Sequence, residues 1–224
     1  MPTKCVSVIK ALVVRLTLLD ACGVPVTGAG SAQVVTAGFT KVENTPNYED
    51  GERYLQKRAD GSACINEQSA GFLNWLEQAV TLCTLDPDLI ALITGDPLIT
   101  TGVTNNTGVI HGGGLLNTRF SMETWQPVAG AGACAADGSQ QYVYWAFPHA
   151  FDTRLQGFNM ENAPFTIAWQ HKTKPASNDW NIGDAYLGDN PADTWGTDRH
   201  WAWNITTVAP PVEACGAVEL ANAS

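Results

Sequence analysis

Alternation of apolar and polar residues with a period of two is the feature that most restricts the fold of this chain. Along residues 6–18, valine and leucine share one face, whereas Ser7, Arg15 and Thr17 fall on the other, and Lys10 is the one misfit on the apolar face. This pattern predicts a half-buried strand. Further strands are predicted at 32–44, 74–85, 119–127 and 142–148, twice within 151–173, and at 201–211, where a double proline should end the last strand.

The composition agrees with a β-rich fold and argues against one class of partner. Charged residues are only 15% of the 224 residues, while glycine and proline number 21 and 12, a balance typical of short strands joined by many turns. The length fits a single domain spanning 1–224. Acidic residues outnumber basic ones by 22 to 12, which gives a net charge of −10. Such a chain repels phosphate, so a nucleic-acid-binding protein is disfavoured.

The cysteines and the N-terminal residues bear on the cellular compartment. The six cysteines, at positions 5, 22, 64, 83, 134 and 215, form no C-x-x-C pair and no Cys/His cluster at zinc spacing. Lys10 and Arg15 interrupt the apolar N-terminal run, which is shorter than the roughly 18 residues of a membrane span and lacks an export signal. We therefore expect synthesis in a reducing cytoplasm, no membrane contact, and mostly free, buried thiols.

The segment 82–97, LCTLDPDLIALITGDP, could be read as a metal site or as a short helix. Asp86 stands at an N-cap position, Pro87 at the first helical position, and Asp88 complements the positive end of the helix dipole. Gly95 suits a left-handed C-cap. A calcium loop starting at Asp86 would need oxygen ligands and a glycine where the chain has isoleucine and alanine. The sequence therefore predicts a helix over about 86–94 and no metal.

Residues 44–61, NTPNYEDGERYLQKRADG, are polar, mixed in charge and closed by an Asp-Gly pair. This composition predicts a long hairpin or a loop that projects from the domain. Loops of this length in a compact domain usually serve a function. A solvated hairpin without a partner is the simpler alternative.

A search for catalytic patterns finds none that is complete. His111 to Gly114 match the oxyanion-hole segment of lipase-type hydrolases, but no Gly-x-Ser-x-Gly elbow accompanies them. No P-loop, dinucleotide fingerprint or His-Glu-x-x-His motif occurs. Single histidines lie at 149, 171 and 200, and the carboxylates Glu123, Asp152, Glu161 and Asp184 show no spacing that selects a pair. We expect no catalytic residue, no cofactor and no metal.

The eight tryptophans leave a binding function open. Trp75, Trp145 and Trp169 fall inside predicted strands and are expected in the core, and Trp125 is ambiguous. The candidate exposed rings belong to the Trp-rich region 174–203 and are Trp180, Trp195, Trp201 and Trp203. A β-sandwich with such a platform would be a carbohydrate-binding module, which is the alternative to the reading that follows.

Several stretches, in order, resemble one protein family. They are LTLLDACGVPV near the start, CTLDPDLIALITG in the middle, YVYWAFP followed by RLQGFNMENAPFTIAWQHKTK, and TTVAPP near the end. Together they resemble the major tail proteins, or tail tube subunits, of long-tailed bacteriophages, particularly those of high-GC Gram-positive hosts. Region 174–203 matches this family only loosely.

The resemblance implies a β-sandwich or barrel-like tail tube fold with one short flanking helix and no catalytic residues. It also implies six-membered rings that stack into a hollow tube around a tape-measure protein, with tail terminator and tail-tip proteins at the ends. Double-stranded DNA would pass through this tube without specific binding, which suits a negatively charged lumen. Assembly in the host cytoplasm and a final place in the virion tail follow. The projecting loop, through Tyr48, Glu49, Glu52, Arg53 and Tyr54, is then the candidate element that reaches a neighbouring subunit.

Overall fold

The computed structural model describes residues 5–102, 105–114, 117–158, 160–188, 195–196 and 198–221. Strands make up 49% of the chain and helices 7%, so the predicted mainly β fold class is confirmed. The strands are β1 (Ser7–Val8), β2 (Val13–Leu18), β3 (Gln33–Thr36), β4 (Phe39–Glu49), β5 (Arg53–Lys57), β6 (Ala63–Gln68), β7 (Phe72–Leu82), β8 (Leu98–Thr101), β9 (Asn105–Val109), β10 (Phe120–Ala129), β11 (Tyr142–Leu155), β12 (Ile167–Thr173), β13 (Ala202–Thr206) and β14 (Ala214–Val218). The helices are α1 (Pro87–Thr94) and α2 (Asp184–Leu187), with a 3₁₀ turn at Gly130–Gly132.

One antiparallel sheet organises the domain, in the order β14-β3-β2-β10-β11-β12-β7-β4. Strand β1 also pairs with β10, and β13 with β11. The sheet forks along the 14-residue strand β11, whose first part pairs with β13 and whose second part pairs with β12. The sequence predicted two strands here. The chain bends instead of breaking, because Asp152 takes a φ of 52° within a register shift between Phe151 and Arg154.

Two hydrophobic cores lie on opposite faces of this sheet. Val14 and Leu16 of β2 belong to the first core, which also contains the apolar side of α1, whereas Val13 of the same strand belongs to the second. The predicted half-buried strand at 6–18 is therefore wrong in two respects. Strand β2 is buried on both faces, and the chain leaves the sheet between β1 and β2, where the misfit Lys10 is exposed.

The C-terminal part of the chain extends the sheet beyond the predicted last strand. Strand β13 ends at Thr206 and the double proline follows it, but the chain then returns as β14. Strand β14 pairs with β3 through Ala214 opposite Val35 and Val218 opposite Gln33. The prolines therefore end one strand without ending the fold.

The helix over 87–94 is capped by the residues that the sequence predicts. One carboxylate oxygen of Asp86 accepts hydrogen bonds from the backbone N–H groups of Asp88 (2.9 Å) and Leu89 (3.4 Å), and Gly95 has a φ of 77°. The other oxygen accepts from the N–H of Gly216 in β14 at 3.1 Å. Asp86 therefore joins the start of α1 to the C-terminal strand.

We predict that Asp86→Ala lowers the free energy of unfolding by about 0.5 to 2 kcal/mol through loss of the cap. Hydrogen exchange should also rise in β14, because Gly216 loses its acceptor. Urea unfolding followed by circular dichroism measures the first effect, and exchange mass spectrometry the second. A chelator should not shift the melting temperature of the wild type; such a shift would favour the metal reading of this segment.

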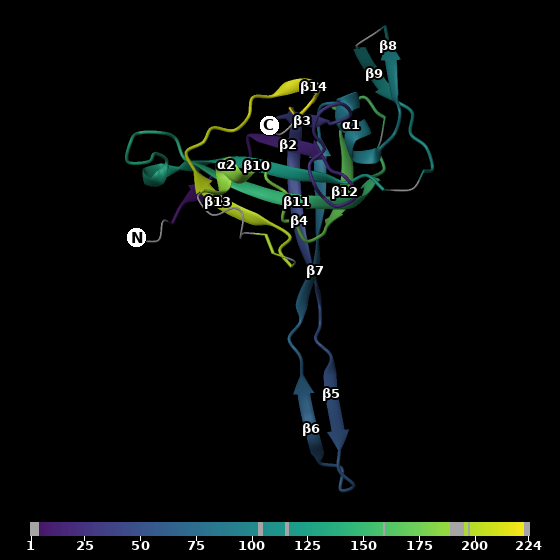
Figure 1. Ribbon diagram of the computed structural model, residues 1–224, viewed down its shortest axis with the longest axis vertical. Coiled ribbons are helices and arrows are strands. Elements are labelled where there is room, and N and C mark those ends of the chain that lie inside the picture. The colour runs from purple at the N-terminus through teal and green to yellow at the C-terminus, as the bar shows by residue number, and fades with distance from the viewer. Residues whose placement is uncertain are drawn as a thin grey trace.

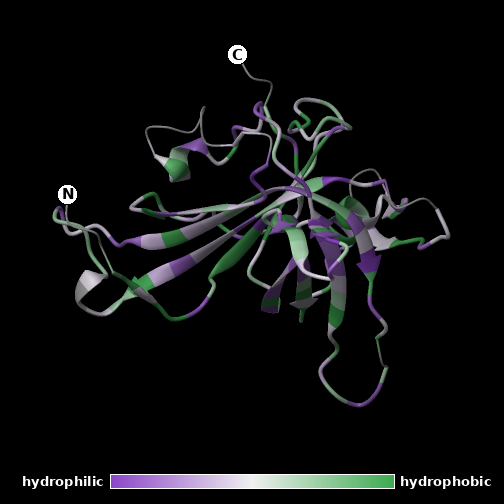
Figure 2. Ribbon diagram, turned by 90° about the horizontal axis from the view of Figure 1, so that it is seen from below, coloured by the Kyte–Doolittle hydropathy of each residue, from purple (hydrophilic) through white to green (hydrophobic). Residues whose placement is uncertain are grey.

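Figure 1 shows the overall shape: a body made of the sheet, α1 and α2, from which the β4–β7 ribbon projects far downward to the β5–β6 pair. The small β8–β9 hairpin projects at the opposite end, near α1. Viewed from below, green and purple segments alternate along strands of the sheet, as expected of strands that bury one set of side chains (Figure 2). Among the described residues, no helix is both long and apolar enough to cross a membrane.

Candidate functional site

The projecting ribbon is the most unusual feature of the molecule. Strands β4 and β7 pair from Phe39 opposite Leu82 to Glu49 opposite Phe72. Beyond this point the chain continues as the β5–β6 hairpin, which turns at Asp60 and Gly61. From Glu49 to the turn, the eleven residues of one strand correspond to roughly 35 Å.

The predicted boundary of this element, 44–61, is wrong. The Asp-Gly pair is the tip of the hairpin and not its end, so the projection returns through residues 62–71. The tip turns here because a carboxylate oxygen of Asp60 accepts hydrogen bonds from the N–H (2.9 Å) and the hydroxyl (2.7 Å) of Ser62, and Gly61 has a φ of 85°. These bonds lower the pKa of Asp60. The Asp-Gly pair itself, a frequent two-residue hairpin turn, was the available signal.

Two glycines allow the ribbon to narrow between its two paired parts. A Cβ atom on Gly51 would lie 1.8 Å from the carbonyl oxygen of Ser69, and one on Gly71 would lie 2.7 Å from that of Glu49. The backbone of Ser69 donates a hydrogen bond to the carbonyl of Glu52 at 3.0 Å. Side chains at these two glycines would therefore separate the strands and change the direction of the hairpin.

All five residues predicted for the assembly loop lie on this ribbon and are exposed. The Tyr54 hydroxyl donates to Glu52 at 2.6 Å, Arg53 donates to Asn66 at 3.2 Å, and Glu49 accepts from Asn74 at 3.2 Å. The bond to Glu52 raises the pKa of Tyr54. Tyr48 is 69% exposed, which is high for so large a ring. The structure thus distributes the five residues along the ribbon and gives four of them hydrogen-bond partners.

Sequence reasoning missed the apolar side chains that the rest of the ribbon exposes. Leu55, Ile65 and Phe72 are 48%, 44% and 59% exposed. Together with the two tyrosines they place five exposed apolar or aromatic side chains along an otherwise polar element, distributed over both faces of the ribbon. Exposed apolar side chains gathered on one element favour association with another protein. The segment after Gly61 lacks strong apolar alternation, which explains why its contribution was overlooked.

A chain of hydrogen bonds fixes the ribbon to the body. Trp169 donates to Nδ1 of His171 (3.2 Å), Nε2 of His171 lies 2.9 Å from Oε1 of the Gln78 side chain, and the side-chain amide of Gln78 donates to Asn44 (2.5 Å). These residues come from β12, β7 and β4 in turn. The accepting Nδ1 places the proton of neutral His171 on Nε2. Burial lowers the pKa of His171 to about 3, so this network holds an uncharged ring.

A groove of about 370 Å³ lies between the first half of β4 and the face of β10 and β11. Its apolar wall is Phe39, Trp145 and Phe147, and the polar lining includes Lys10 and Lys41. The indole N–H of Trp145 donates to the side-chain oxygen of Gln126 at 3.0 Å, which fixes the ring. The groove therefore combines three aromatic rings, one of them fixed by a hydrogen bond, with two amines, and it lies beside the base of the ribbon.

The predicted platform of four tryptophans is not formed. Trp180 and Trp195 are buried to 1% exposure in the second core, where their rings meet edge to face. Trp201 and Trp203 remain 39% and 53% exposed and lie against Trp145, with ring centroids 5.6 and 6.1 Å apart. Trp125 and Trp169 are fully buried, whereas Trp75 and Trp145 are only partly covered. Residues 189–194 and 197 of the Trp-rich region lie outside the described residues.

A buried ionic cluster occupies the second core. Arg15 donates twice to Glu123, through Nε and Nη2 at 2.6 Å each, and Nη2 also donates to the carbonyl of Ile182 at 3.0 Å. The Tyr144 hydroxyl donates to Glu123 at 2.5 Å. Burial and the negative charge of Glu123 both raise the pKa of Tyr144. For Arg15, burial lowers the pKa, but the charge of Glu123 and its hydrogen bonds outweigh burial, so the pKa of Arg15 is raised. The cluster ties the segment around Ile182 to the sheet.

The remaining polar residues singled out from the sequence lie apart from one another. His111 approaches Asp96 (2.5 Å) on the surface, and Asp152 binds Arg154 and Lys172, whose hydrogen bonds lower its pKa despite partial burial. Asp184 opens the short helix α2. Among the described residues, no group of three or more His, Cys, Asp or Glu side chains could hold a metal ion.

The cysteine thiols lie at the surface of the molecule. The six cysteines are free, as expected, but all six are exposed, so the expectation of buried thiols is wrong.

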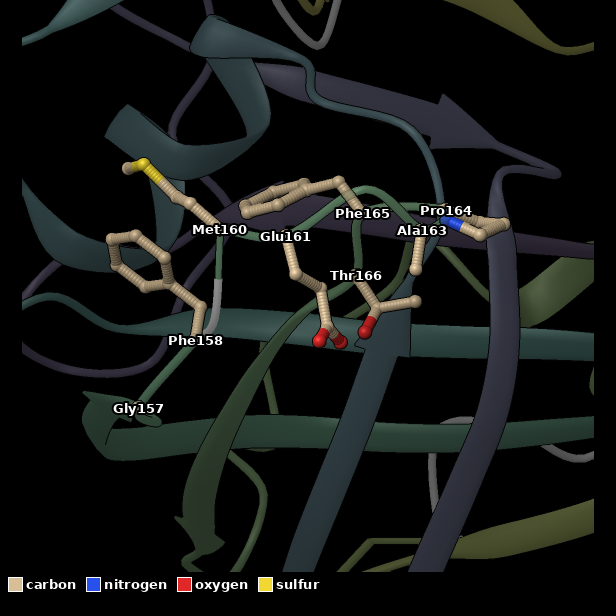
Figure 3. Close-up of a pocket in the computed structure, with 8 residues that line it drawn as sticks. All are labelled: Gly157, Phe158, Met160, Glu161, Ala163, Pro164, Phe165 and Thr166. Atoms are coloured by element: carbon tan, nitrogen blue, oxygen red, sulfur yellow. The ribbon is translucent and has the colours of Figure 1, made fainter.

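A hollow of about 490 Å³ lies within the loop between β11 and β12, and Figure 3 shows Phe158, Met160 and Phe165 gathered on one side of it. Glu161 points its carboxylate away from these side chains. A single loop supplies the whole lining, unlike the groove beside the ribbon.

Comparison with known proteins adds no assignment. No protein-family model matches the chain, and no curated protein matches it.

Proposed function

We propose that this chain is a tail tube subunit of a long-tailed bacteriophage, a structural protein that forms stacked six-membered rings in the virion tail. The observation that carries the proposal is the projecting ribbon with its exposed apolar residues. The ribbon leaves five large apolar or aromatic side chains 44% to 69% exposed, and a partner that covers them would remove that surface from water. The ordered sequence resemblance supplies the identity of the partner, which is another copy of the chain.

Ring formation agrees with the placement of these features. A closed ring requires a heterologous interface, in which one surface of a subunit meets a different surface of the next. The ribbon and the body are two such surfaces in one chain. Exposed edges of the sheet, such as those of β4 and β13, offer additional sites for pairing between copies.

The other partners follow from a tube. A tape-measure protein would lie inside it during assembly, terminator and tip proteins would bind at its ends, and DNA would pass through it. The net charge of −10 supports passage without binding, since basic contacts to phosphate would retain the DNA. Assembly would take place in the cytoplasm of the bacterial host.

We predict that a protein without the hairpin remains folded but forms no tubes. Residues 50–71 would be replaced by Asn-Gly, because Glu49 and Phe72 are opposite each other in the ribbon and a two-residue turn joins such a pair. The fold should survive because both cores lie outside the deleted segment. Negative-stain microscopy and sedimentation of the wild type and the variant, with and without the tape-measure protein, measure assembly.

A variant with intact length serves as the control. Glu161→Lys changes an exposed residue of the β11–β12 loop, far along the chain from the ribbon, and should leave tubes intact. Tubes formed at the wild-type level by the shortened protein would show that the hairpin is not an assembly element. Wild-type protein that stays monomeric even with the tape-measure protein would contradict the proposed function itself.

Carbohydrate binding is a second candidate, supported by the exposed rings of Trp201 and Trp203 beside Trp145. These rings could stack against the apolar faces of sugars. Binding to a glycan array that is lost in Trp201→Ala but kept in Glu161→Lys would support this function over assembly.

A further inference from the structure

The groove beside the ribbon is an interaction surface for which the chain itself contains a complement. One wall is β4, an edge strand of the sheet, and the facing wall is formed by Trp145 and Phe147 of β11. Trp203 is directly opposite Trp145 in the register of β11 and β13, so it continues the same face. The groove thus opens onto a broad aromatic surface instead of closing as a pocket.

The rim of the groove is basic in a protein that is otherwise strongly acidic. Lys10 is exposed and forms no ion pair among the described residues. Lys41 contacts Glu43 at 2.6 Å, but both side chains are more than half exposed, so this pair is screened by water. An acidic and aromatic partner would therefore be favoured here.

The stalk of the ribbon presents such a face. Glu49 and Phe72 are direct partners in the β4–β7 register, so their side chains lie next to each other on one face. Phe72 is 59% exposed, and Glu49 is exposed with a hydrogen bond from Asn74. We call this pair the stalk face. It combines one aromatic ring and one carboxylate, and its acidity continues into Asp50 and Glu52.

Resting on the proposed function, we infer that the groove receives the stalk face of a second copy of the chain. Phe72 of one subunit packs against Phe39 and Trp145 of the next, and Glu49 meets Lys10. The occupant is a copy of the chain because the complementary aromatic and acidic residues are already present on its own exposed ribbon.

The groove and the stalk face lie at opposite ends of one strand. Phe39 in the groove and Glu49 of the stalk face are ten residues apart on β4, which is about 34 Å, so the stalk face cannot reach the groove of its own subunit. The hairpin tip lies roughly 35 Å further along the ribbon and remains available to an adjacent ring.

Charge reversal tests this pairing in the full-length protein. Lys10→Glu and Glu49→Lys each place like charges in contact, and each should lower the fraction of protein in tubes about tenfold or more. The double variant restores opposite charges and should recover most of that fraction. Glu161→Lys carries the same charge change as Glu49→Lys away from the groove and should assemble normally. Circular dichroism and melting temperature establish that every variant is folded.

A cross-linking experiment gives an independent readout. A photoreactive phenylalanine analogue at position 72 should cross-link to peptides of another copy that contain Phe39–Asn44 or Trp145. Cross-links to other regions in tubes that form normally would overturn the inference while leaving the proposed function intact. So would unchanged assembly of both single variants, or failure of the double variant to recover. Loss of glycan binding in Lys10→Glu, with no cross-link to protein, would identify the groove as a sugar site instead.

Discussion

Replacing Glu123 with alanine is expected to lower the free energy of unfolding by about 3 to 5 kcal/mol, because it leaves the buried charge of Arg15 without a partner. Glu123 is fully buried and accepts three hydrogen bonds, two from Arg15 and one from Tyr144. The variant therefore loses all three bonds and gains a cavity in the second core. Urea unfolding at neutral pH measures the effect.

A companion variant separates the cost of a broken pair from the contribution of the intact one. In the triple change Arg15→Met, Glu123→Leu and Tyr144→Phe, no unpaired charge remains, so the protein should recover most of the lost stability. Glu161→Ala, at an exposed position, should change stability by less than about 0.5 kcal/mol. A Glu123→Ala protein as stable as the wild type would show that the charge is compensated elsewhere.

Acidification is expected to destabilise the protein well above the pH at which carboxylates usually titrate. Burial lowers the pKa of His171 to about 3, and burial together with the charges of Lys174 and Arg119 lowers that of His149 to about 4. In the unfolded chain both rings take up a proton near the ordinary pKa of 6.5. The neutral rings therefore contribute their full stabilisation above pH 6.5. This contribution falls between pH 6.5 and about 4 for His149, and between pH 6.5 and about 3 for His171.

Below pH 6.5, each of the two histidines should lower the free energy of unfolding by at most about 1.4 kcal/mol per pH unit. Burial also lowers the pKa of His200, whose Nδ1 lies 3.0 Å from the hydroxyl of Thr173, and this ring adds to the slope. Urea unfolding at pH 7, 6 and 5 measures the slope before most carboxylates titrate. The double variant His149→Gln and His171→Gln should show a much shallower dependence. An identical slope in both proteins would mean that other groups control acid unfolding.

Protonation of His171 should also loosen the ribbon. Nδ1 accepts the indole N–H of Trp169 in the neutral ring, and a protonated Nδ1 no longer accepts it. The same network continues through Gln78 to Asn44 at the base of the ribbon. Because the pKa of His171 in the folded protein is about 3, this ring stays neutral at mildly acidic pH, so the network at the base of the ribbon is expected to persist until the fold itself is lost.

Local signals account for what the sequence predicted well. Helix α1 begins and ends where Asp86, Pro87 and Gly95 place it, because capping involves residues within one turn of each other. The mainly β class and most strand positions follow equally from alternation. The tip of the hairpin at Asp60 and Gly61 was also visible as a turn, although its place in the middle of the projection was not.

Features that depend on distant segments could not be predicted in the same way. Trp180 and Trp195 are buried because residues 176–188 and 195 pack on the face of the sheet that carries the second core, which no local pattern indicates. The continuity of β11 depends on its having two different partners, and the length of the ribbon depends on pairing between residues 63–68 and 53–57. The candidate groove likewise joins β4 to β10 and β11, which are far apart in the sequence.

The fork at β11 has a mechanical consequence. Because its backbone hydrogen-bonds to β13 over one part and to β12 over the other, the two branches of the sheet cannot slide past each other without breaking bonds along this one strand. A force applied to the ribbon is transmitted between neighbouring strands, from β7 through β12 to β11 and from β11 to β10 and β2. Tension applied at the tip is thus borne in shear by many hydrogen bonds at once, an arrangement that resists stretching.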